Sequence, residues 1–486
     1  MLITGLAIAT VFIISLCCLI VATKLGFATK NFDKQTIRNI HSRYTPRVGG
    51  IGIVVAMAIS VPVLALVLSD FDVIRSGSLL TYLGIIGAAG LLFVVGLIDD
   101  FGNLSHRWKF LFQIAAAEIL VASGTIIETL DFGALGTVPL GILAVPFTLL
   151  FVVGLINAMN FVDGLDGLAA GLSFISLGVC VALLSRAGEL NLAKGLFVMM
   201  TCLVAFLAFN FHPAKIFLGD AGSLTIGLLV SAGVIHAFQT TGGGIAAPTF
   251  LLPVFIPLLD TGTAIVRRFI AGMSLFGADR DHIHHRIYQR TGSQTKTVLL
   301  MWSIALALGA SALLLVTAES WLFALGVLTA LSAISVLFWI SGIYVLLNPN
   351  HIRERLHRHR NDNKRLRNSL AALVDQLEKS ESLWEVNHML VNTVSMLGCT
   401  SFIISFNAGR GESTFSWMRS DHHQRRPEDI VHDEFPIRSN GEVVGTVRAG
   451  WLKEQLDGLF EKRLLTEQLA EDIQATYRYV HPRTPG

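Results

Sequence analysis

The feature that most constrains this chain is a series of long apolar runs from Leu2 to Leu347, separated by short polar breaks. An apolar run of roughly 20 residues is long enough to cross the hydrocarbon core of a bilayer as a helix. Only 15% of the residues are charged, whereas an ordinary soluble domain carries about 25%. This part of the chain therefore predicts an all-α polytopic membrane protein with about eleven transmembrane helices.

The charged residues between the runs predict which side of the membrane each loop faces. The spans are expected near 2–23, 49–69, 79–97, 109–127, 138–156, 167–185, 192–210, 221–239, 247–267, 298–316 and 321–347. The first run has no Lys or Arg before it and Lys24 after it, which indicates a retained anchor with its N-terminus outside. Alternate loops then fall on one side, and these carry most of the Lys and Arg, as cytoplasmic loops do.

The composition changes after Leu347 and predicts two further segments. Residues 348–382 are basic and carry leucines at helical spacing, which favours a helical linker or stalk. Residues 383–486 alternate between helical and β patterns, with strands expected at 401–406, 434–438 and 443–451 and a closing helix at 453–479. A Ser-Asn-Gly-Glu sequence between two of these strands is typical of a hairpin turn. The order of these elements resembles that of a small GAF-like sensory domain. We therefore expect a membrane domain at 1–347, followed by a helical linker and a small cytoplasmic α+β domain.

Acidic residues cluster where several of the apolar runs meet their polar breaks. The clusters are Asp99 and Asp100, Asp163 and Asp166, Asp220, and Asp281 next to three histidines. The loop parity places every cluster on the cytoplasmic side. Ionisable groups are costly at membrane depth, so such clusters are functional hypotheses by default.

The residue types in these clusters suit a divalent metal and phosphate groups. Mg²⁺ takes oxygen ligands and usually keeps substrate phosphates in its shell, and the Asp pairs stand near asparagines and glycines. Glycine lets the backbone approach a phosphate closely. Arg107 and Lys109, just after the first Asp pair, can bind phosphate oxygens. The pattern therefore predicts a nucleotide-diphosphate site with a divalent metal.

At this point the motifs resemble the polyprenyl-phosphate N-acetylhexosamine-1-phosphate transferases of glycosyltransferase family 4. The resemblance covers roughly Met1 to Leu347, and its motifs follow the family's order. They are Pro46 to Gly50, Asp99 and Asp100, Arg107 to Gln113, Asn157 to Ala169, Phe217 to Ser223, and His282-Ile-His-His. The His-Ile-His-His form resembles the undecaprenyl-phosphate N-acetylglucosaminyl 1-phosphate transferase branch rather than the muramoyl-pentapeptide branch.

The resemblance implies transfer of an N-acetylhexosamine 1-phosphate from its UDP-sugar to undecaprenyl phosphate, with release of UMP, at a bacterial inner membrane. It implies Mg²⁺, or Mn²⁺ as an alternative, on Asn160 and Asp220, and catalytic roles for Asp99, Asp100 and Lys109. We also expect a homodimer in contact with membrane lipids and no nucleic-acid partner. The residues expected to bind substrate are Arg47, Asn157, Asp163, Asp166, His282, His284, His285 and Arg286.

Each motif also has a simpler structural interpretation. The Asp pair could merely end a helix, Asp220 could be a helix N-cap, and Lys109 could be an interfacial lysine whose stem lies along apolar surface. The histidines could hold a structural zinc ion. Two Asn and two Asp at spacings of three, over 157–166, favour one helical face over a loop.

The function classes that remain open beside the transferase are a secondary transporter and a membrane sensor. Intramembrane acids also mark ion pathways, but here they cluster at helix ends and no internal repeat is evident. The net charge of +2 points to no nucleic-acid partner. The five cysteines show no C-x-x-C spacing, which disfavours a disulfide framework or a cysteine metal site.

Overall fold

The computed structural model describes the helices of the N-terminal part and a set of strands near the C-terminus. The described residues are 2–29, 45–67, 79–102, 104–132, 136–240, 247–271, 282–317, 319–342, 401–408, 411–418, 430–439 and 442–452. The chain divides into two compact units, one containing these helices and one containing the C-terminal strands. The expected helical linker at 348–382 and the closing helix at 453–479 lie outside the described residues.

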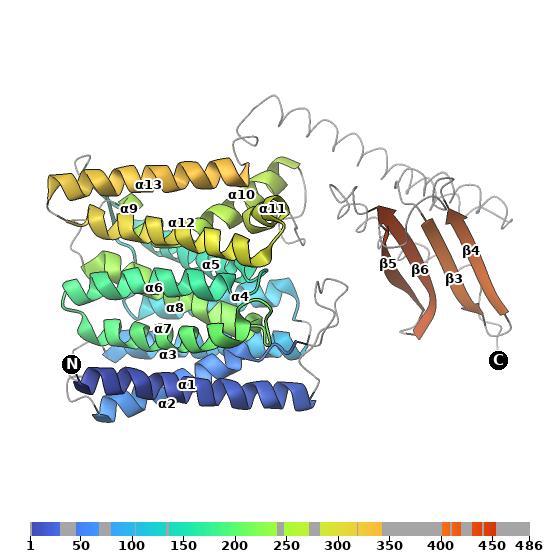
Figure 1. Ribbon diagram of the computed structural model, residues 1–486, viewed down its shortest axis with the longest axis horizontal. Coiled ribbons are helices and arrows are strands. Elements are labelled where there is room, and N and C mark those ends of the chain that lie inside the picture. The colour runs from blue at the N-terminus through green and yellow to red at the C-terminus, as the bar shows by residue number, and fades with distance from the viewer. Residues whose placement is uncertain are drawn as a thin grey trace. The chain divides into compact units, whose positions relative to one another are not determined.

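Helices make up the first unit, most of them long and apolar, and Figure 1 shows the long helices lying side by side. They are α1 (Leu2–Thr29), α2 (Gly49–Val67), α3 (Leu79–Phe101), α4 (His106–Ala122), α5 (Ala144–Val162), α6 (Leu168–Arg186), α7 (Leu190–Asn210), α8 (Gly219–Thr240), α9 (Ala247–Leu251), α10 (Phe255–Ala271), α11 (Ile283–Thr291), α12 (Gln294–Leu315) and α13 (Ser320–Ser341). Short 3₁₀ turns, η2 (Gly141–Leu143) and η3 (Leu252–Val254), precede α5 and α10, and strands β1 (Thr129–Asp131) and β2 (Thr137–Pro139) pair between α4 and α5.

Ten helical segments among the described residues are long and apolar enough to cross a membrane. This confirms the all-α polytopic membrane protein that the sequence predicts. The remaining expected span, near 109–127, is the 17-residue helix α4. A helix satisfies its own backbone hydrogen bonds, which is the condition for a segment in hydrocarbon.

Helix α8 lies at the centre of the bundle and packs against α2, α3, α5 and α6. In all, 94% of this span is buried inside the protein, more than in any other span described. Small residues make this possible: a Cβ on Gly227 would lie 2.8 Å from the Cα of Ile156 in α5. Close backbone approach through small residues is typical of helix packing in membranes.

Two buried hydroxyls of α8 are satisfied within the helix itself. Thr225 and Ser231 in α8 each donate to the carbonyl four residues earlier, at 2.7 Å. A hydroxyl bonded in this way can be buried without leaving an unpaired polar group. The polar residues of α8 are therefore compatible with its central place.

The second unit contains a four-stranded antiparallel sheet with strand order β4-β3-β6-β5. The strands are β3 (Ser401–Ala408), β4 (Gly411–Met418), β5 (Ile430–Ser439) and β6 (Glu442–Leu452). The predicted strands correspond to β3, β5 and β6, and β5 pairs with β6 as the predicted hairpin does. Strand β4 was not predicted from the sequence. The resemblance to GAF-like domains stays a prediction.

Candidate active site

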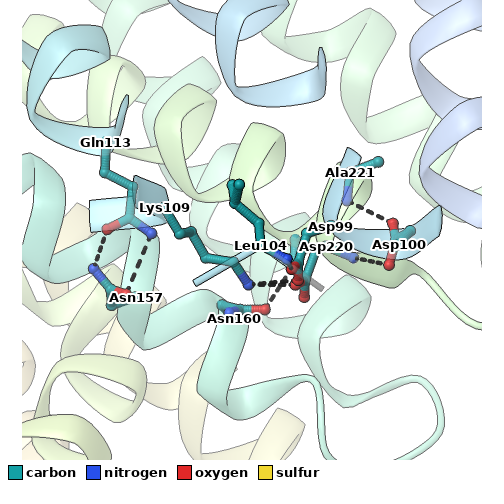
Figure 2. A network of polar contacts seen from close by, with 10 residues as sticks. Asp99, Asp100, Leu104, Lys109, Gln113, Asn157, Asn160, Asp220 and Ala221 are labelled. Atoms are coloured by element: carbon teal, nitrogen blue, oxygen red, sulfur yellow. Dashed lines mark hydrogen bonds and ion pairs between the residues drawn. The ribbon is translucent and has the colours of Figure 1, made fainter. Parts of the chain in front are cut away.

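The centre of the candidate site is Lys109, near the start of α4. Its ammonium Nζ lies 2.9 Å from Oδ2 of Asp99, in the last turn of α3, and also pairs with Oδ2 of Asp220. Figure 2 shows the lysine pointing toward both carboxylates. All three side chains are mostly buried. Because α3 ends here and α4 and α8 begin here, the cluster lies at one end of the bundle.

Asp100 has a different role from its neighbour, since it closes the start of α8. Its carboxylate accepts hydrogen bonds from the backbone N–H of Asp220 at 3.0 Å and of Ala221 at 2.9 Å. The first N–H groups of a helix have no partner inside the helix, and a carboxylate there also favours the helix dipole. One interpretation of the sequence makes Asp220 the cap of this helix. The structure shows that Asp100 of α3 provides it instead.

The residue before Asp220 is a glycine for a steric reason. Gly219 has φ +72°, and a Cβ at this position would lie 2.6 Å from Oδ2 of Asp100. Because of the positive φ and this contact, any side chain at position 219 would be strained. The Gly-Asp pair is therefore the junction at which α3 and α8 meet.

The end of α5 adds amide groups to the same end of the bundle. Asn160 accepts a hydrogen bond through Oδ1 from the hydroxyl of Ser223, one turn after Asp220 in α8, at 2.8 Å. Asn157 exchanges two amide hydrogen bonds with Gln113 of α4, at 2.7 and 3.3 Å. Helix α5 ends at Val162, six residues later than expected, so both asparagines lie within its last turns.

The Pro46 to Gly50 motif is held against the start of α8 by its backbone. The N–H of Gly49 donates to the carbonyl of Phe217 at 2.9 Å, and the N–H of Phe217 donates to the carbonyl of Pro46 at 2.9 Å. Arg47, half-buried, lies between these contacts in sequence. This pairing fixes Arg47 beside the acidic cluster.

Asp163 caps the end of α5 and is influenced by the same charges. Burial raises the pKa of the Asp163 carboxyl well above its usual value, the negative charge of Asp220 raises it further, and the guanidinium of Arg47 offsets part of the increase. A group with a shifted pKa beside several charges is typical of a functional site. Asp163 therefore belongs electrostatically to the Asp220 cluster.

Asp166 does not share the helical face that the spacing of three predicted. It follows the turn after α5, and its Oδ2 accepts from the backbone N–H of Ala214 at 3.1 Å and lies 2.8 Å from Nδ1 of His212. The helical pattern ends at Asp163, the residue after α5. The expectation of one common face is therefore wrong for Asp166.

The histidine motif forms the start of a helix rather than a loop. His282 precedes α11 as its N-cap, and His284, His285 and Arg286 lie in the first turn. Nδ1 of His282 and of His284 lie 3.1 and 2.8 Å from the two carboxylate oxygens of Asp260 in α10. His285 and Arg286 are half-buried and make further contacts. Asp281 lies outside the described residues.

Sequence reasoning missed Asp260, Gln113, Ser223 and His212 as partners of the predicted residues. Asp260 carried a usable signal, because an acidic residue inside an apolar span is costly without a partner. The other three are polar residues whose partners lie far away in the chain. Only the packing of the helices reveals these pairs.

The oxygen-rich cluster fits a hard divalent cation. Two carboxylates, those of Asp99 and Asp220, converge on the ammonium of Lys109, so a positive charge is stabilised at this point. The side chain of Asn160 in α5 offers a neutral amide oxygen at the same end of the bundle. Carboxylate and amide oxygens are the ligands that Mg²⁺ uses in proteins.

The fold and site together define a multi-pass membrane protein with a charged, oxygen-rich site at one end of its helical bundle. The family model described as Glycosyl transferase family 4 matches residues 82–237, which include Asp99, Lys109, Asn160 and Asp220. The chain belongs to glycosyl transferase family 4, and it is an enzyme of the transferase class.

Individual relatives in three bacteria are similar over most of their length. The chain is 33% identical over 325 residues to a probable undecaprenyl-phosphate N-acetylglucosaminyl 1-phosphate transferase of Bacillus subtilis, covering 65% of this chain and 87% of the relative. It is 38% identical over 304 residues to a decaprenyl-phosphate N-acetylglucosaminephosphotransferase of Mycolicibacterium smegmatis, covering 56% and 73%. It is 31% identical over 298 residues to an undecaprenyl-phosphate alpha-N-acetylglucosaminyl 1-phosphate transferase of Escherichia coli K12, covering 60% and 77%.

Proposed function

We propose that this protein transfers N-acetylglucosamine 1-phosphate from UDP-N-acetylglucosamine to undecaprenyl phosphate and releases UMP. The observation that carries the proposal is the convergence of Asp99, Lys109 and Asp220 at one end of a membrane bundle. A phosphoryl donor with two phosphates needs cations to neutralise its charge and a site that aligns it. The relatives named for the polyprenyl-phosphate reaction support this choice of acceptor and sugar.

In this proposal Asp220 and Asn160 hold Mg²⁺, with Mn²⁺ as an alternative. The metal supplies charge stabilisation at the donor diphosphate. Lys109 can exchange its carboxylate partners for phosphate oxygens of the donor, because its side chain is flexible and its ammonium can donate three hydrogen bonds. Arg47, whose guanidinium acts on the Asp163 carboxyl, adds a second positive charge.

The transfer is a single displacement at phosphorus. An oxygen of the lipid phosphate bonds to the phosphorus that carries the sugar, and the bond from that phosphorus to the bridging oxygen of UMP breaks. Asp99 positions the acceptor, and Asp100 holds the start of α8 in place. A lipid phosphate is already largely anionic at neutral pH, so a general base has little to add. Isolation of a covalent phosphoenzyme from UDP-sugar without lipid acceptor would refute direct attack.

The site and the C-terminal unit are proposed to face the cytoplasm of a bacterium, across its inner membrane. The basic residues between the spans support this orientation, because cytoplasmic loops carry an excess of Lys and Arg. A cysteine introduced at Lys34, between α1 and α2, should react with a membrane-impermeant maleimide only after the cells are opened. Labelling of intact cells at this position would contradict the orientation.

The test is a reconstituted reaction with purified protein, Mg²⁺, undecaprenyl phosphate and a panel of UDP-sugars. We expect UMP release and a lipid-linked product with UDP-N-acetylglucosamine, and less with its epimers. Omission of the lipid acceptor is the matched control and should remove UMP release. A folded sample that releases no UMP with any UDP-N-acetylhexosamine would refute the proposed function.

A further inference from the structure

Gln113 is a buried polar side chain of α4 that the proposed reaction leaves without a role. It is 1% exposed and lies about one helical turn after Lys109. Its Oε1 accepts a hydrogen bond from Nδ2 of Asn157 in α5 at 2.7 Å, and its Nε2 donates to Oδ1 of the same residue at 3.3 Å. Figure 2 shows the two amide groups facing each other. A buried amide is costly unless it is hydrogen-bonded, and this single partner satisfies both of its ends.

Both protons of the Asn157 amide are engaged within the protein. Beside its bond to Gln113, Nδ2 donates to the carbonyl of Val153, four residues earlier in α5, at 2.8 Å. A side-chain amide has two donor protons, so Asn157 has none left for another molecule. The resemblance implies a substrate contact for Asn157, whereas these hydrogen bonds favour a contact between helices.

Three side-chain contacts join α4, α5 and α8 in pairs around the candidate site. The ammonium of Lys109 joins α4 to α8, and the amide oxygen of Asn160 joins α5 to α8. The Gln113–Asn157 pair joins α4 to α5 and completes a closed ring. A shift of any one of these helices along its axis would therefore stretch two of the three contacts.

The proposed reaction changes two of these contacts and leaves the third in place. Donor phosphates draw Lys109 away from Asp220, and a metal ion takes an oxygen of Asn160. The Gln113–Asn157 pair lies about one helical turn further inside the bundle, because α4 begins and α5 ends at the site. The pair is neutral and its amides satisfy each other, so it offers little attraction to a metal ion or a phosphate. It is therefore the contact that still joins α4 to α5 when a donor is bound.

We propose that Gln113 and Asn157 are positioning residues: they hold α4 against α5, so that Lys109 reaches the donor diphosphate after it leaves its carboxylate partners. The inference rests on the proposed function, because it takes the UDP-sugar as the donor. It gives Gln113 a role in the reaction, and it assigns Asn157 to the alignment of the site instead of to contact with the substrate.

The first variant is Gln113→Met, which keeps the length of the side chain and removes both hydrogen bonds. Loss of one hydrogen bond from a charged group to the donor corresponds to a loss of about 10-fold in affinity. We expect the Kd and KM for UDP-N-acetylglucosamine to rise by that factor. The KM for undecaprenyl phosphate should be unchanged, because Asp99 of α3 positions the acceptor. Ile119→Met, at an exposed position of the same helix, is the matched control and should bind the donor as the wild-type protein does.

Two double variants separate positioning from a general structural role. Gln113→Asn with Asn157→Gln exchanges the amides at constant combined length, so it should recover donor affinity. Gln113→Met with Asn157→Leu replaces both amides by apolar groups, which can restore stability without a directional contact, so it should recover only the midpoint of thermal unfolding. Donor Kd is measured by calorimetry with the full-length protein in Mg²⁺, without lipid acceptor. Wild-type donor affinity in Gln113→Met or in the apolar pair, or no recovery in a folded exchanged pair, would overturn the proposal.

The distance between the two helices provides a measurement that needs no UDP-sugar. Cysteines introduced at Leu111 of α4 and Leu150 of α5, both exposed, carry spin labels in a full-length protein whose native cysteines are replaced by serine. We expect a narrow distance distribution in the otherwise unchanged protein and in the exchanged pair, and a broader or shifted one in Gln113→Met. Asn157→Leu is the second variant in case Gln113→Met does not fold. An unchanged distribution in a folded single variant would overturn the proposal.

Failure of this inference can be distinguished from failure of the proposed function. A wild-type protein that binds UDP-N-acetylglucosamine but releases no UMP would refute the proposed function alone, since the binding and distance measurements on the variants still apply. Normal UMP release with wild-type donor affinity in Gln113→Met would refute the inference alone. A wild-type protein that binds no UDP-sugar would refute both.

Discussion

Asp99 and Asp100 are neighbours with the same side chain, yet their carboxylates make different contacts. Successive residues of a helix point about 100° apart, so Asp99 faces Lys109 while Asp100 faces the first N–H groups of α8. One carboxylate is held by a mobile cation, and the other by fixed backbone groups. We therefore expect the carboxylate of Asp99 to exchange its partner for a substrate, and that of Asp100 to keep its contacts with the start of α8.

Replacement of each aspartate by asparagine should separate these roles. Asp100→Asn leaves one backbone N–H of α8 facing an NH₂ group, and we expect a loss of about 1–3 kcal/mol in the free energy of unfolding. Asp99→Asn keeps an acceptor for the N–H of Leu104 and should lower turnover with little change in stability. Thermal unfolding in detergent and UMP release measure the two effects. A stable, active Asp100→Asn protein would contradict the capping role.

The proposed metal site makes a second prediction. Chelation by EDTA should abolish UMP release, and added Mg²⁺ should restore it in the wild-type protein. Asp220→Asn should express normally, but it should not recover activity at any Mg²⁺ concentration, because a ligand and a negative charge are missing. Glu118→Gln, the same change at an exposed position of α4, is the control and should behave as wild type. Full Mg²⁺-dependent activity of Asp220→Asn would exclude it as a ligand.

At the residue scale, the sequence predicts which charged residues lie together at one end of the bundle. It does not predict which of them form hydrogen bonds or ion pairs with one another. The cost of charge in an apolar run pointed to Asp99, Lys109 and Asp220. Asp99 pairs with Lys109 while Asp100 caps α8, and this difference depends on how α3 is rotated against α8. The periodicity of the sequence does not predict that rotation. The spacing of the asparagines and aspartates predicts one helical face through Asp166, but the helix ends at Val162.

At the scale of elements, helix α8 organises the site because it can be approached closely from several sides. A Cβ on Gly50 of α2 would lie 2.2 Å from the N of Gly222, and one on Gly96 of α3 would lie 2.5 Å from the N of Ala221. The start of α8 is thus in backbone contact with two neighbouring helices. The position of Asp220 follows from these contacts.

Two glycines of α3 give a matched test of this packing. Gly96→Ala places a methyl group against the backbone of α8, and overpacking of this kind typically costs about 1–3 kcal/mol. We expect a lower midpoint of thermal unfolding and reduced UMP release. Gly87→Ala in the same helix meets nothing within 4 Å and should be neutral. Similar stability of the two variants would show that α3 and α8 can separate freely.

Hydropathy predicted the helices because each must be apolar over the thickness of the bilayer. It was less accurate at their ends: α5 begins at Ala144 instead of residue 138, and the histidine motif begins the short helix α11 instead of lying in a loop. Helix α11 carries polar and charged residues around apolar ones, so no long apolar run marks it. Capping contacts and tertiary packing set these ends.

At the scale of the whole molecule, the chain has two units, and all of the polar contacts that build the candidate site lie in the first. A chain that ends at Asn350 should therefore insert into the membrane and release UMP at a rate similar to that of the full-length protein. The measurement compares equal amounts of the two folded proteins in one lipid mixture. Complete loss of activity in a stably inserted truncation would show that the second unit contributes to catalysis.

The central position of α8 has a consequence for how the protein is made. The helices that surround it, α2, α3, α5 and α6, all leave the ribosome before α8 does. A newly inserted helix enters the bilayer at its edge, in contact with lipid. Helix α8 must then pass between helices that are already in place, or these must assemble late and close around it. Biogenesis therefore requires the early helices to stay loosely associated until α8 has arrived, so that the carboxylates of the candidate site meet only when most of the bundle has been synthesised.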